Sequence, residues 1–419
     1  MSKTIHPYSI HHIDLYKQLD LPSISTANTG NYVVFWWQQM PLGQFFLEPG
    51  AALNERSYVE RLVETISLAV KFYCSKHNVK EADWKGWILR KQIDELNAWF
   101  SVLFTIYVPA KMPAEVPVSV LICTRNRSEQ LTNCLNMLQA LSCRAQEIIV
   151  IDNAPVDDST KAVVEKFKDV TYIREARAGL DIARNTGVKN AHCPLVAFVD
   201  DDVLVHPEWL FRVWETFEEP STDAMTGLVI ASELETEAQL IFETYWSFNR
   251  GYKDVYYDNN YFQKTLVKGP PVWEIGAGAN MAFRRSVFDK AGLFNDLLDA
   301  GAAGCNGDSE MWFRILAKGS TIHYNPRAVV YHEHRRDMPG LKKQIFNYMR
   351  GFTTAVLVQQ NLVPACNYKK YKLKGFFKHY LRVAIKNFPS YPFQLQTAWP
   401  EAKGILSGLM FYRKNKTRF

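Results

Sequence analysis

Several features that define other classes of protein are missing from these 419 residues. The seven cysteines are an odd number and include none of the close pairs that zinc ligands or a redox motif need, so we expect reduced thiols. No run of about 18 apolar residues is present, which argues against a membrane-spanning helix. The first residues also lack the basic-then-apolar pattern of a signal peptide. Together these absences lead us to expect a cytoplasmic protein.

The composition that remains is ordinary for a folded chain. It is 47% hydrophobic, 13% aromatic and 22% charged, which is too apolar for general disorder. A chain of this length exceeds what a single hydrophobic core usually serves. We therefore expect one large domain with additions on either side.

Charge is spread unevenly along the chain, although the net value is only +6. From Asp337 onward, fifteen Lys and Arg residues face two acidic residues. Two interpretations of this basic tail stay open, namely peripheral contact with anionic lipid at the inner face of a membrane and a solvated helical face. No recognised nucleic-acid motif accompanies it, so we expect no nucleic-acid partner. The basic and aromatic residues concerned are Lys369, Lys370, Tyr371, Lys372, Lys374, Phe376, Phe377, Lys378, Tyr380 and Arg382.

A change of pattern divides the chain near residues 111–117, where Pro113 and Pro117 are typical of a linker. Ahead of it, residues 32–46 read as β-structure with a turn at Pro41-Leu42-Gly43, and residues 54–73 have helical spacing. We predict three regions from these changes. They are a small accessory α+β domain over residues 1–115, a central domain over 116–336 and a basic helical region over 337–419.

After Pro117, short apolar runs alternate with amphipathic stretches. This pattern predicts an α/β fold with a mostly parallel sheet and helices on both faces. Ligands of such sheets bind beyond the carboxyl ends of the strands. The predicted strands are 118–124, 147–152, 170–174 and 195–199, and the predicted helices are 129–140, 159–167 and 181–191.

Three adjacent carboxylates, Asp200, Asp201 and Asp202, follow the predicted strand 195–199. They repel one another unless a cation neutralises them. While the chain stays extended, Asp200 and Asp202 point the same way and can address one ligand. Mn²⁺ or Mg²⁺ takes few carboxylates and completes its shell with water and phosphate oxygens, which suits a diphosphate substrate. The alternative is an acidic turn before the helix that Pro207 begins.

A second acidic cluster runs from Gly307 to Glu310 and opens a helical stretch that Gly319 ends. At a helix start, unpaired backbone N–H groups stabilise a carboxylate, and such an N-cap accounts for one acidic residue. The functional alternative is a general base that takes the proton of an attacking hydroxyl group.

Two histidines follow the apolar pair Val329-Val330. In a strand, His332 and His334 would share one face, and a neutral imidazole is a good ligand for Mn²⁺. A structural histidine with satisfied hydrogen bonds is the commoner role. Arg335 and Arg336 come next and have the charge to contact a diphosphate or an anionic acceptor, with solvent exposure as the alternative.

The ends of the first two predicted strands have the chemistry to bind a nucleotide. Thr124, Arg125 and Arg127 supply a hydroxyl group and guanidinium donors, and Asp152 and Asn153 supply acceptors for a base or a ribose. Each of them taken alone is equally consistent with a turn or a cap.

Taken together and in this order, the motifs resemble those of the family-2 glycosyltransferases with a GT-A fold, over about residues 116–360. One departure is that the family often has Glu-Asp before the second acidic helix, whereas Gly307 stands where that Glu would be. The matching pieces are Val120–Arg127, Ile149–Asn153, Gly179–Asn185, Asp200–Asp202, Gly278–Arg285, the Gly307–Glu310 cluster and His332.

The resemblance implies an inverting transfer of a sugar from a nucleotide-diphosphate donor, with UDP the expected nucleotide, to a hydroxyl of a glycan, a lipid-linked sugar or another acceptor. It implies Mn²⁺ or Mg²⁺ held by Asp202 and His332, with His334 competing for the second place, and Asp308 as the base, with Glu310 in reserve. The donor site would comprise Thr124, Arg125, Arg127, Asp152, Asn153, Arg184, Asp200 and Asp201.

Two other functions stay open at this point. One is a catalytically inactive nucleotide- or glycan-binding protein of the same fold. The other is a sugar nucleotidyltransferase, which needs a phosphate-binding glycine-rich loop after the first strand, where residues 124–128 contain no glycine. On the acceptor side, Trp273 is a candidate to stack on a sugar, with a place in the core as the alternative.

Overall fold

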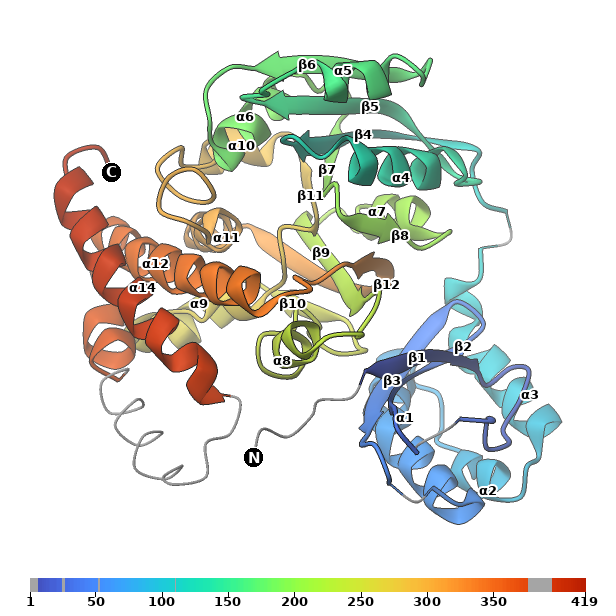
Figure 1. Cartoon of the computed structure of the whole chain (residues 1–419). Helices are drawn as coiled ribbons and strands as arrows, with labels where there is room; N and C mark the ends of the chain where they lie inside the picture. Colours follow the sequence, from blue (N-terminus) through green and yellow to red (C-terminus); the bar gives the residue numbers. More distant parts are fainter. Residues whose placement is uncertain (1–6, 25–26, 52, 110, 376–393) are drawn as a thin grey trace.

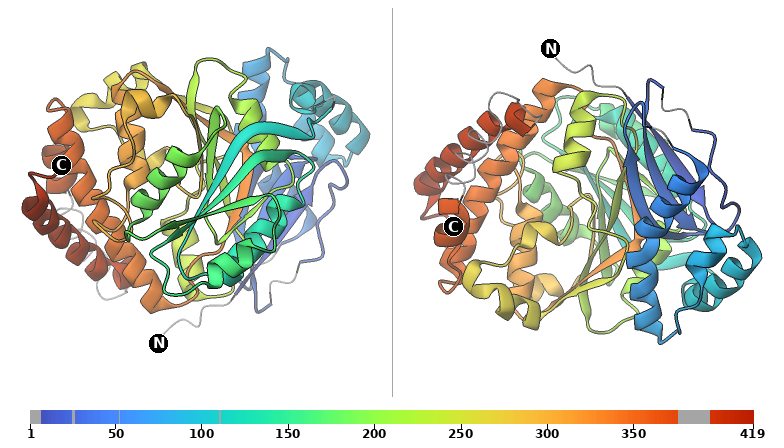
Figure 2. Two further views of the ribbon diagram at one scale, coloured as in Figure 1. Left: turned by 90° about the horizontal axis from the view of Figure 1, so that it is seen from above. Right: turned by 90° about the horizontal axis from the view of Figure 1, so that it is seen from below.

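The computed structural model describes residues 7–24, 27–51, 53–109, 111–375 and 394–419, and Figure 1 shows their arrangement. The strands form a three-stranded sheet in the order β1-β2-β3 and a nine-stranded sheet in the order β10-β12-β9-β11-β7-β4-β5-β6, with β8 beside β12. The N-terminal region and the C-terminal helices lie on opposite sides of the large sheet (Figure 2).

The N-terminal region combines the small sheet with helices, as the α+β pattern predicts. Successive residues of a strand point to opposite faces, so Val33 and Phe35 of β2 pack against these helices, whereas Val34 and Trp36 pack against Ile230 of the large sheet. The small sheet is therefore buried on both faces. Its elements are β1 (Tyr8–Asp14), β2 (Gly30–Trp37), β3 (Met40–Leu47), α1 (Glu55–His77), α2 (Trp84–Leu89), α3 (Ile93–Phe104) and η1 (Thr105–Tyr107).

The turn between β2 and β3 lies at Gln38, so the prediction of a turn at Pro41 and Gly43 is wrong. Gln38 adopts a left-handed backbone with φ 51°. Pro41 pairs with Trp36 where the ladder shifts register, and a bulge is a place where a strand tolerates proline. A Cβ at position 43 would lie 2.6 Å from Cγ2 of Thr65, so this glycine serves close packing of α1 on β3.

The large sheet confirms the predicted α/β fold class. The strands and helices predicted between residues 118 and 199 are all present, with ends shifted by at most three residues. These elements are β4 (Glu115–Thr124), α4 (Ser128–Gln139), β5 (Arg144–Asn153), α5 (Ser159–Val164), β6 (Val170–Glu175), α6 (Leu180–Asn190) and β7 (Leu195–Val199). The elements that follow are β8 (Val203–Val205), α7 (Trp209–Thr216), β9 (Thr222–Ala231), α8 (Glu237–Tyr245), β10 (Val255–Tyr257), α9 (Asn259–Thr265), η2 (Leu266–Lys268), η3 (Val272–Glu274), β11 (Asn280–Arg284), α10 (Val287–Ala291), α11 (Gly307–Ala317) and β12 (Thr321–His332).

Six strands of the large sheet run in one direction, namely β4, β5, β6, β7, β9 and β12, while β8, β10 and β11 run against them. Side chains alternate between two cores: Ala197 of β7 faces α4, α5 and α7, and Phe198 faces α6, α10 and α11. Helices thus cover both faces. The acidic residues 200–202 directly follow β7 and lie at the carboxyl edge of the parallel strands.

The C-terminal region consists of α12 (Met338–Leu362), the π-helical turn η4 (Lys369–Leu373) and α14 (Gln394–Asn415). Phe352 and Val356 of α12 enter the core of the large sheet. Helix α14 lies against α12, where Gly404 and Gly408 allow close approach to the backbone of Arg350. None of the described helices combines the length and apolarity needed to cross a bilayer. The tail residues Phe376, Phe377, Lys378, Tyr380 and Arg382 lie outside the described residues.

Candidate active site

A cavity of about 1240 Å³ opens at the carboxyl ends of β4 and β7. Its walls come from these strand ends, the loop before β11, the start of α11 and one face of α12. Most of the predicted site residues meet there, although they lie far apart in sequence. The predicted residues that line the cavity are Thr124, Arg125, Arg127, Asn153, Arg184, Asp200, Asp201, Asp202, Trp273, Asp308, His332 and Arg335.

Asp201 is the member of the acidic triplet that the protein itself neutralises. Its carboxylate accepts hydrogen bonds from Oγ1 of Thr124 at 2.7 Å and from Nη1 of Arg127 at 2.8 Å. The same guanidinium nitrogen reaches Asp202 at 2.9 Å. Thr124 thus holds the carboxylate of Asp201 in place, and Arg127 holds those of Asp201 and Asp202. Both residues were predicted to bind the nucleotide. Arg125 is exposed on the cavity wall.

Among the described residues, one group of metal-type ligands gathers, formed by Asp200, Asp202 and His332, with ligand atoms within 4.8 Å of one another. Burial and the charge of Asp202 raise the pKa of Asp200 to about 7. Burial lowers the pKa of His332 to about 4, so its imidazole is neutral and keeps a lone pair. Two carboxylates and one neutral imidazole fit Mn²⁺ or Mg²⁺.

His334 does not share a strand face with His332, which corrects the prediction. Strand β12 ends at His332, so the alternation of a strand no longer applies beyond it. The His334 ring instead contacts the His332 ring, with the two Nδ1 atoms 3.1 Å apart. Its Nε2 is 2.9 Å from Oε2 of Glu243. His334 is therefore outside the group of metal-type ligands.

Arg184 is buried and holds two carboxylates, of which Asp181 belongs to the same motif and Asp299 was missed by the sequence analysis. Its Nη1 lies 2.9 Å from Asp181 and 2.7 Å from Asp299. A Cβ at Gly278 would lie 2.8 Å from Nη2 of Arg184, so a larger residue there would displace the guanidinium group. Arg184 therefore lines the cavity and offsets the negative charge of Asp181 and Asp299.

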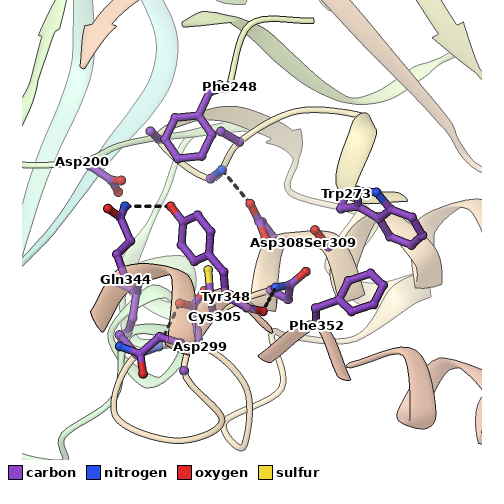
Figure 3. A pocket seen from close by; sticks show the side chains of 18 of the residues that line it. Asp200, Phe248, Trp273, Asp299, Cys305, Asp308, Ser309, Gln344, Tyr348 and Phe352 are labelled. Atoms are coloured by element: carbon purple, nitrogen blue, oxygen red, sulfur yellow. Dashed lines mark hydrogen bonds between the residues drawn. The ribbon is translucent and has the colours of Figure 1, made fainter. Parts of the chain in front are cut away.

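Asp308 lies in the first turn of α11 and lines the cavity. Its Oδ2 accepts a hydrogen bond from the backbone N–H of Gly278 at 2.8 Å, and its Oδ1 accepts one from Ser309 at 2.7 Å. Burial and the nearby charge of Asp299 raise the pKa of Asp308, which makes the carboxylate a better proton acceptor. Figure 3 shows Asp308 between Asp200 and an aromatic pair.

The structure explains why Gly307 stands where a Glu is common in the resembling family. A Cβ at position 307 would collide with the carboxylate of Asp181, which occupies that space. Glu310, held in reserve as the base, is buried against Nε of Arg314 at 2.8 Å and does not line the cavity. The geometry therefore gives no support to Glu310 as the base.

An aromatic wall forms the side of the cavity away from the acidic triplet. The ring centroids of Trp273 and Phe352 are 4.8 Å apart in an edge-to-face arrangement, and Nζ of Lys372 lies 5.0 Å from the Trp273 centroid. Gln344 donates a hydrogen bond to the hydroxyl of Tyr348 at 2.9 Å. The sequence analysis missed the α12 residues, although Gln344, Tyr348 and Phe352 recur at the four-residue spacing of one helix face.

Asp152 and Asn153 end β5 but differ in their access to the cavity. Asp152 is buried, accepts a hydrogen bond from the hydroxyl of Tyr172 at 2.9 Å, and is not a lining residue. Its Oδ1 has no hydrogen-bond partner within the described residues. Asn153 lines the cavity and fixes the loop before α6, since its Oδ1 accepts from the N–H of Gly179 at 2.9 Å.

Known proteins with similar sequences show which class of protein this chain resembles. Residues 119–292 match the profile described as glycosyl transferase family 2. The succinoglycan biosynthesis protein ExoM of Rhizobium meliloti (strain 1021) is 27% identical over 252 residues, which cover 56% of this chain and 74% of ExoM. The glucosyl-dolichyl phosphate glucuronosyltransferase of Haloferax volcanii is 23% identical over 295 residues, 66% of this chain and 88% of that protein.

Two further matches are a shorter sequence match and a more distant solved structure. Glycosyltransferase AglE of Haloferax volcanii is 31% identical over 119 residues, and the match covers 27% of this chain and 39% of AglE. Among solved structures, the mannosyltransferase PcManGT from Pyrobaculum calidifontis in complex with GDP-Man and Mn²⁺ is 16% identical, with a TM-score of 0.42 over 74% of this chain and 77% of that chain.

An α/β sheet with an acidic triplet at a strand end and a second carboxylate across one cavity defines a glycosyltransferase that uses nucleotide sugars. The matched segment contains the acidic triplet and the cavity residues Thr124, Arg127 and Arg184. The chain is therefore a glycosyltransferase, and its residues 119–292 are similar to glycosyl transferase family 2.

Proposed function

We propose that this glycosyltransferase moves a sugar from a nucleotide-diphosphate donor, with UDP the expected nucleotide, to an acceptor hydroxyl and inverts the anomeric configuration. The observation that carries the proposal is that Asp308 faces the same cavity as the group formed by Asp200, Asp202 and His332. A base and a site for a charged leaving group on one cavity are what a single displacement requires.

The donor lies, in this proposal, over the carboxyl ends of β4, β5 and β7. Cavity-lining donors and acceptors on these strand ends suit the polar edges of a nucleotide. The proposed donor site comprises Thr124, Arg125, Arg127, Asn153, Arg184, Asp200 and Asp201, with the buried Asp152 next to Asn153 at the end of β5.

Asp202 and His332 would hold Mn²⁺ or Mg²⁺, with Asp200 close by. The His332 Nε2 atom and the Asp202 Oδ1 atom are 3.6 Å apart, which exceeds hydrogen-bond length, so both atoms would be free to act as ligands of a divalent cation. A bound divalent cation supplies Lewis-acid stabilisation of the departing diphosphate.

Asp308 takes the proton of the acceptor hydroxyl while that oxygen attacks the anomeric carbon. The new bond forms on the face opposite the bond to the diphosphate, which breaks, so the configuration inverts. The backbone N–H of Gly278 and of Ser309 orient the Asp308 carboxylate for this step. Trp273 and Phe352 bound the acceptor side, where an aromatic face suits the C–H face of a sugar ring.

The test is a panel of UDP-, GDP- and dTDP-sugars incubated with the protein, with and without Mn²⁺. Metal-dependent hydrolysis of one donor is expected, and NMR of the freshly released sugar should show the anomer opposite to that of the donor. Retention of configuration, or failure of every nucleotide sugar to bind in any metal, contradicts the proposal.

We also propose peripheral contact with anionic lipid through the outer face of α14. Trp399, Leu406 and Met410 are 68%, 59% and 55% exposed, and their spacing of seven and four residues keeps them on one side of the helix with Lys403 between them. Basic charge beside exposed apolar side chains suits an anionic membrane surface. A lipid-linked acceptor would then reach the cavity from that surface, because Glu401 of α14 also lines the cavity.

Vesicle flotation tests this contact. Wild-type protein is expected to float with phosphatidylglycerol vesicles and not with phosphatidylcholine vesicles, and Trp399→Ser combined with Met410→Ser should abolish flotation. Leu68→Ser is the matched control because Leu68 is 64% exposed on α1. Equal flotation of the double variant and the control contradicts the membrane proposal.

A further inference from the structure

A chain of buried hydrogen bonds leads from His332 away from the cavity. The Nδ1 atoms of His332 and His334 are 3.1 Å apart, and Nε2 of His334 is 2.9 Å from Oε2 of Glu243. All three side chains are buried. The rings of Phe242 and Phe248 lie against the two imidazoles, with centroids 4.5 Å from His334 and 5.3 Å from His332. Water is thus kept from the chain of bonds.

The series of buried contacts continues from Glu243 into the N-terminal region. Oε1 of Glu243 accepts a hydrogen bond from Oγ of Ser247 at 3.0 Å, and the hydroxyl oxygen of Tyr32 lies 3.4 Å from the same carboxylate oxygen. Tyr32 is fully buried on β2, and its hydroxyl also contacts Gln44 of β3. The small sheet therefore touches the carboxylate that orients His334.

The chemistry of each group sets the direction of these bonds. An ionised carboxylate only accepts, so the Nε2–H of His334 donates to Glu243. We take His334 in its neutral form, in which Nδ1 carries a lone pair and accepts from the Nδ1–H of His332. That leaves the lone pair of His332 on Nε2, the atom that faces Oδ1 of Asp202 at 3.6 Å.

We propose that His334 and Glu243 are positioning residues, which hold His332 in the tautomer that presents Nε2 to a divalent cation, and that Tyr32 gives the N-terminal region a part in this metal site. The inference rests on the proposed function, since it takes Asp202 and His332 as ligands. Hydrogen bonds of this kind fix the ring orientation of a metal-binding histidine, and their loss costs about 10- to 100-fold in metal affinity.

The first test measures Mn²⁺ affinity of the full chain by electron paramagnetic resonance. Glu243→Met removes the acceptor at similar volume and is expected to weaken Mn²⁺ binding by about 10- to 100-fold. Glu243→Gln keeps an acceptor oxygen for His334 and should stay within about threefold of wild type.

Tyr32→Phe tests the contribution of the N-terminal region and is expected to weaken Mn²⁺ binding by a few-fold. Tyr8→Phe is the matched control, because the Tyr8 hydroxyl donates a similar hydrogen bond to Glu48 at 2.8 Å on the same sheet without reaching His334. Unchanged Mn²⁺ affinity in Glu243→Met, or equal losses in Glu243→Met and Glu243→Gln, overturns the positioning role, and equal effects of the two Tyr variants overturn the role of Tyr32.

The second test reads the tautomer directly in the metal-free protein. Nitrogen-15 NMR of labelled histidine, with the His332 signals assigned from a His332→Gln variant, is expected to show protonated Nδ1 and unprotonated Nε2 in wild type and a mixture in Glu243→Met. A protonated Nε2 in wild type overturns the inference. If wild type binds no Mn²⁺ at all, the proposed function fails by itself, while the tautomer measurement still decides the positioning role.

Discussion

The two sides of the cavity are built differently. The acidic side comes from strand ends within the segment that matches the family, and Thr124 and Arg127 already brace its carboxylates. The aromatic side comes largely from α12 and η4, beyond that segment, and it presents Phe352 and Lys372 to the cavity. This difference supports our proposal that the shared fold binds the donor, whereas the added helices bind the acceptor.

The largest effect is expected where the two sides meet, at Asp308. Asp308→Asn keeps an acceptor for the N–H of Gly278 but cannot take a proton, so the transfer rate should fall by about 10²- to 10⁴-fold while donor affinity stays within about twofold. Steady-state kinetics and calorimetric donor titration check this. Comparable losses of rate and donor affinity would mean that Asp308 serves the donor side.

The next effect concerns the stability of the acidic side. Arg184→Met leaves the buried Asp181 and Asp299 without their cation and should lower the free energy of unfolding by about 3–5 kcal/mol. Urea denaturation measures the loss. Arg56→Met, which breaks an exposed pair with Glu60, is the control and should cost less than about 1 kcal/mol. Similar losses in the two variants would show that the buried pair is not essential.

A pH effect on stability is expected at the contact with the N-terminal region. His206 stacks on Trp36 at 5.5 Å, and burial lowers the pKa of His206 to about 4. Since the unfolded pKa is 6.5, the unfolded state binds the proton first, and stability is lost as pH falls from 6.5 towards 4, by roughly 3 kcal/mol in total.

Urea denaturation at pH 7 and pH 4.5 measures this loss. His206→Phe keeps a stacking ring without a titratable group and should show a smaller drop in unfolding free energy between the two pH values. An identical drop in wild type and His206→Phe would assign the acid sensitivity to other groups.

The smallest effect is expected on the aromatic side. Trp273→Ala should raise the acceptor KM by roughly tenfold and leave donor affinity unchanged, because stacking is worth about 1 kcal/mol or somewhat more. Trp273→Phe, which keeps an aromatic face, should show a smaller rise. A weaker donor affinity in Trp273→Ala would place the donor sugar, and not the acceptor, against this wall.

Much of this account could be predicted from sequence because its signals are local. The alternation of apolar runs located β4 to β7, and an acidic triplet directly after β7 had to lie at a strand end. Gln38 and Pro41 show where local signals fail, since the bulge that moves the turn depends on pairing with Trp36. The partners Asp299 and Glu243 were not predicted, because their contacts with Arg184 and His334 join segments 115 and 91 residues apart.

Donor binding in the presence and absence of Mn²⁺ tests the central claim most directly, with wild type, Asp202→Ala and Asp308→Asn titrated with the nucleotide that the donor panel identifies. The account predicts Mn²⁺-dependent binding in wild type, its loss in Asp202→Ala, and its retention in Asp308→Asn without turnover. Binding that ignores Mn²⁺, or that survives unchanged in Asp202→Ala, would contradict a metal-assisted transfer at this site.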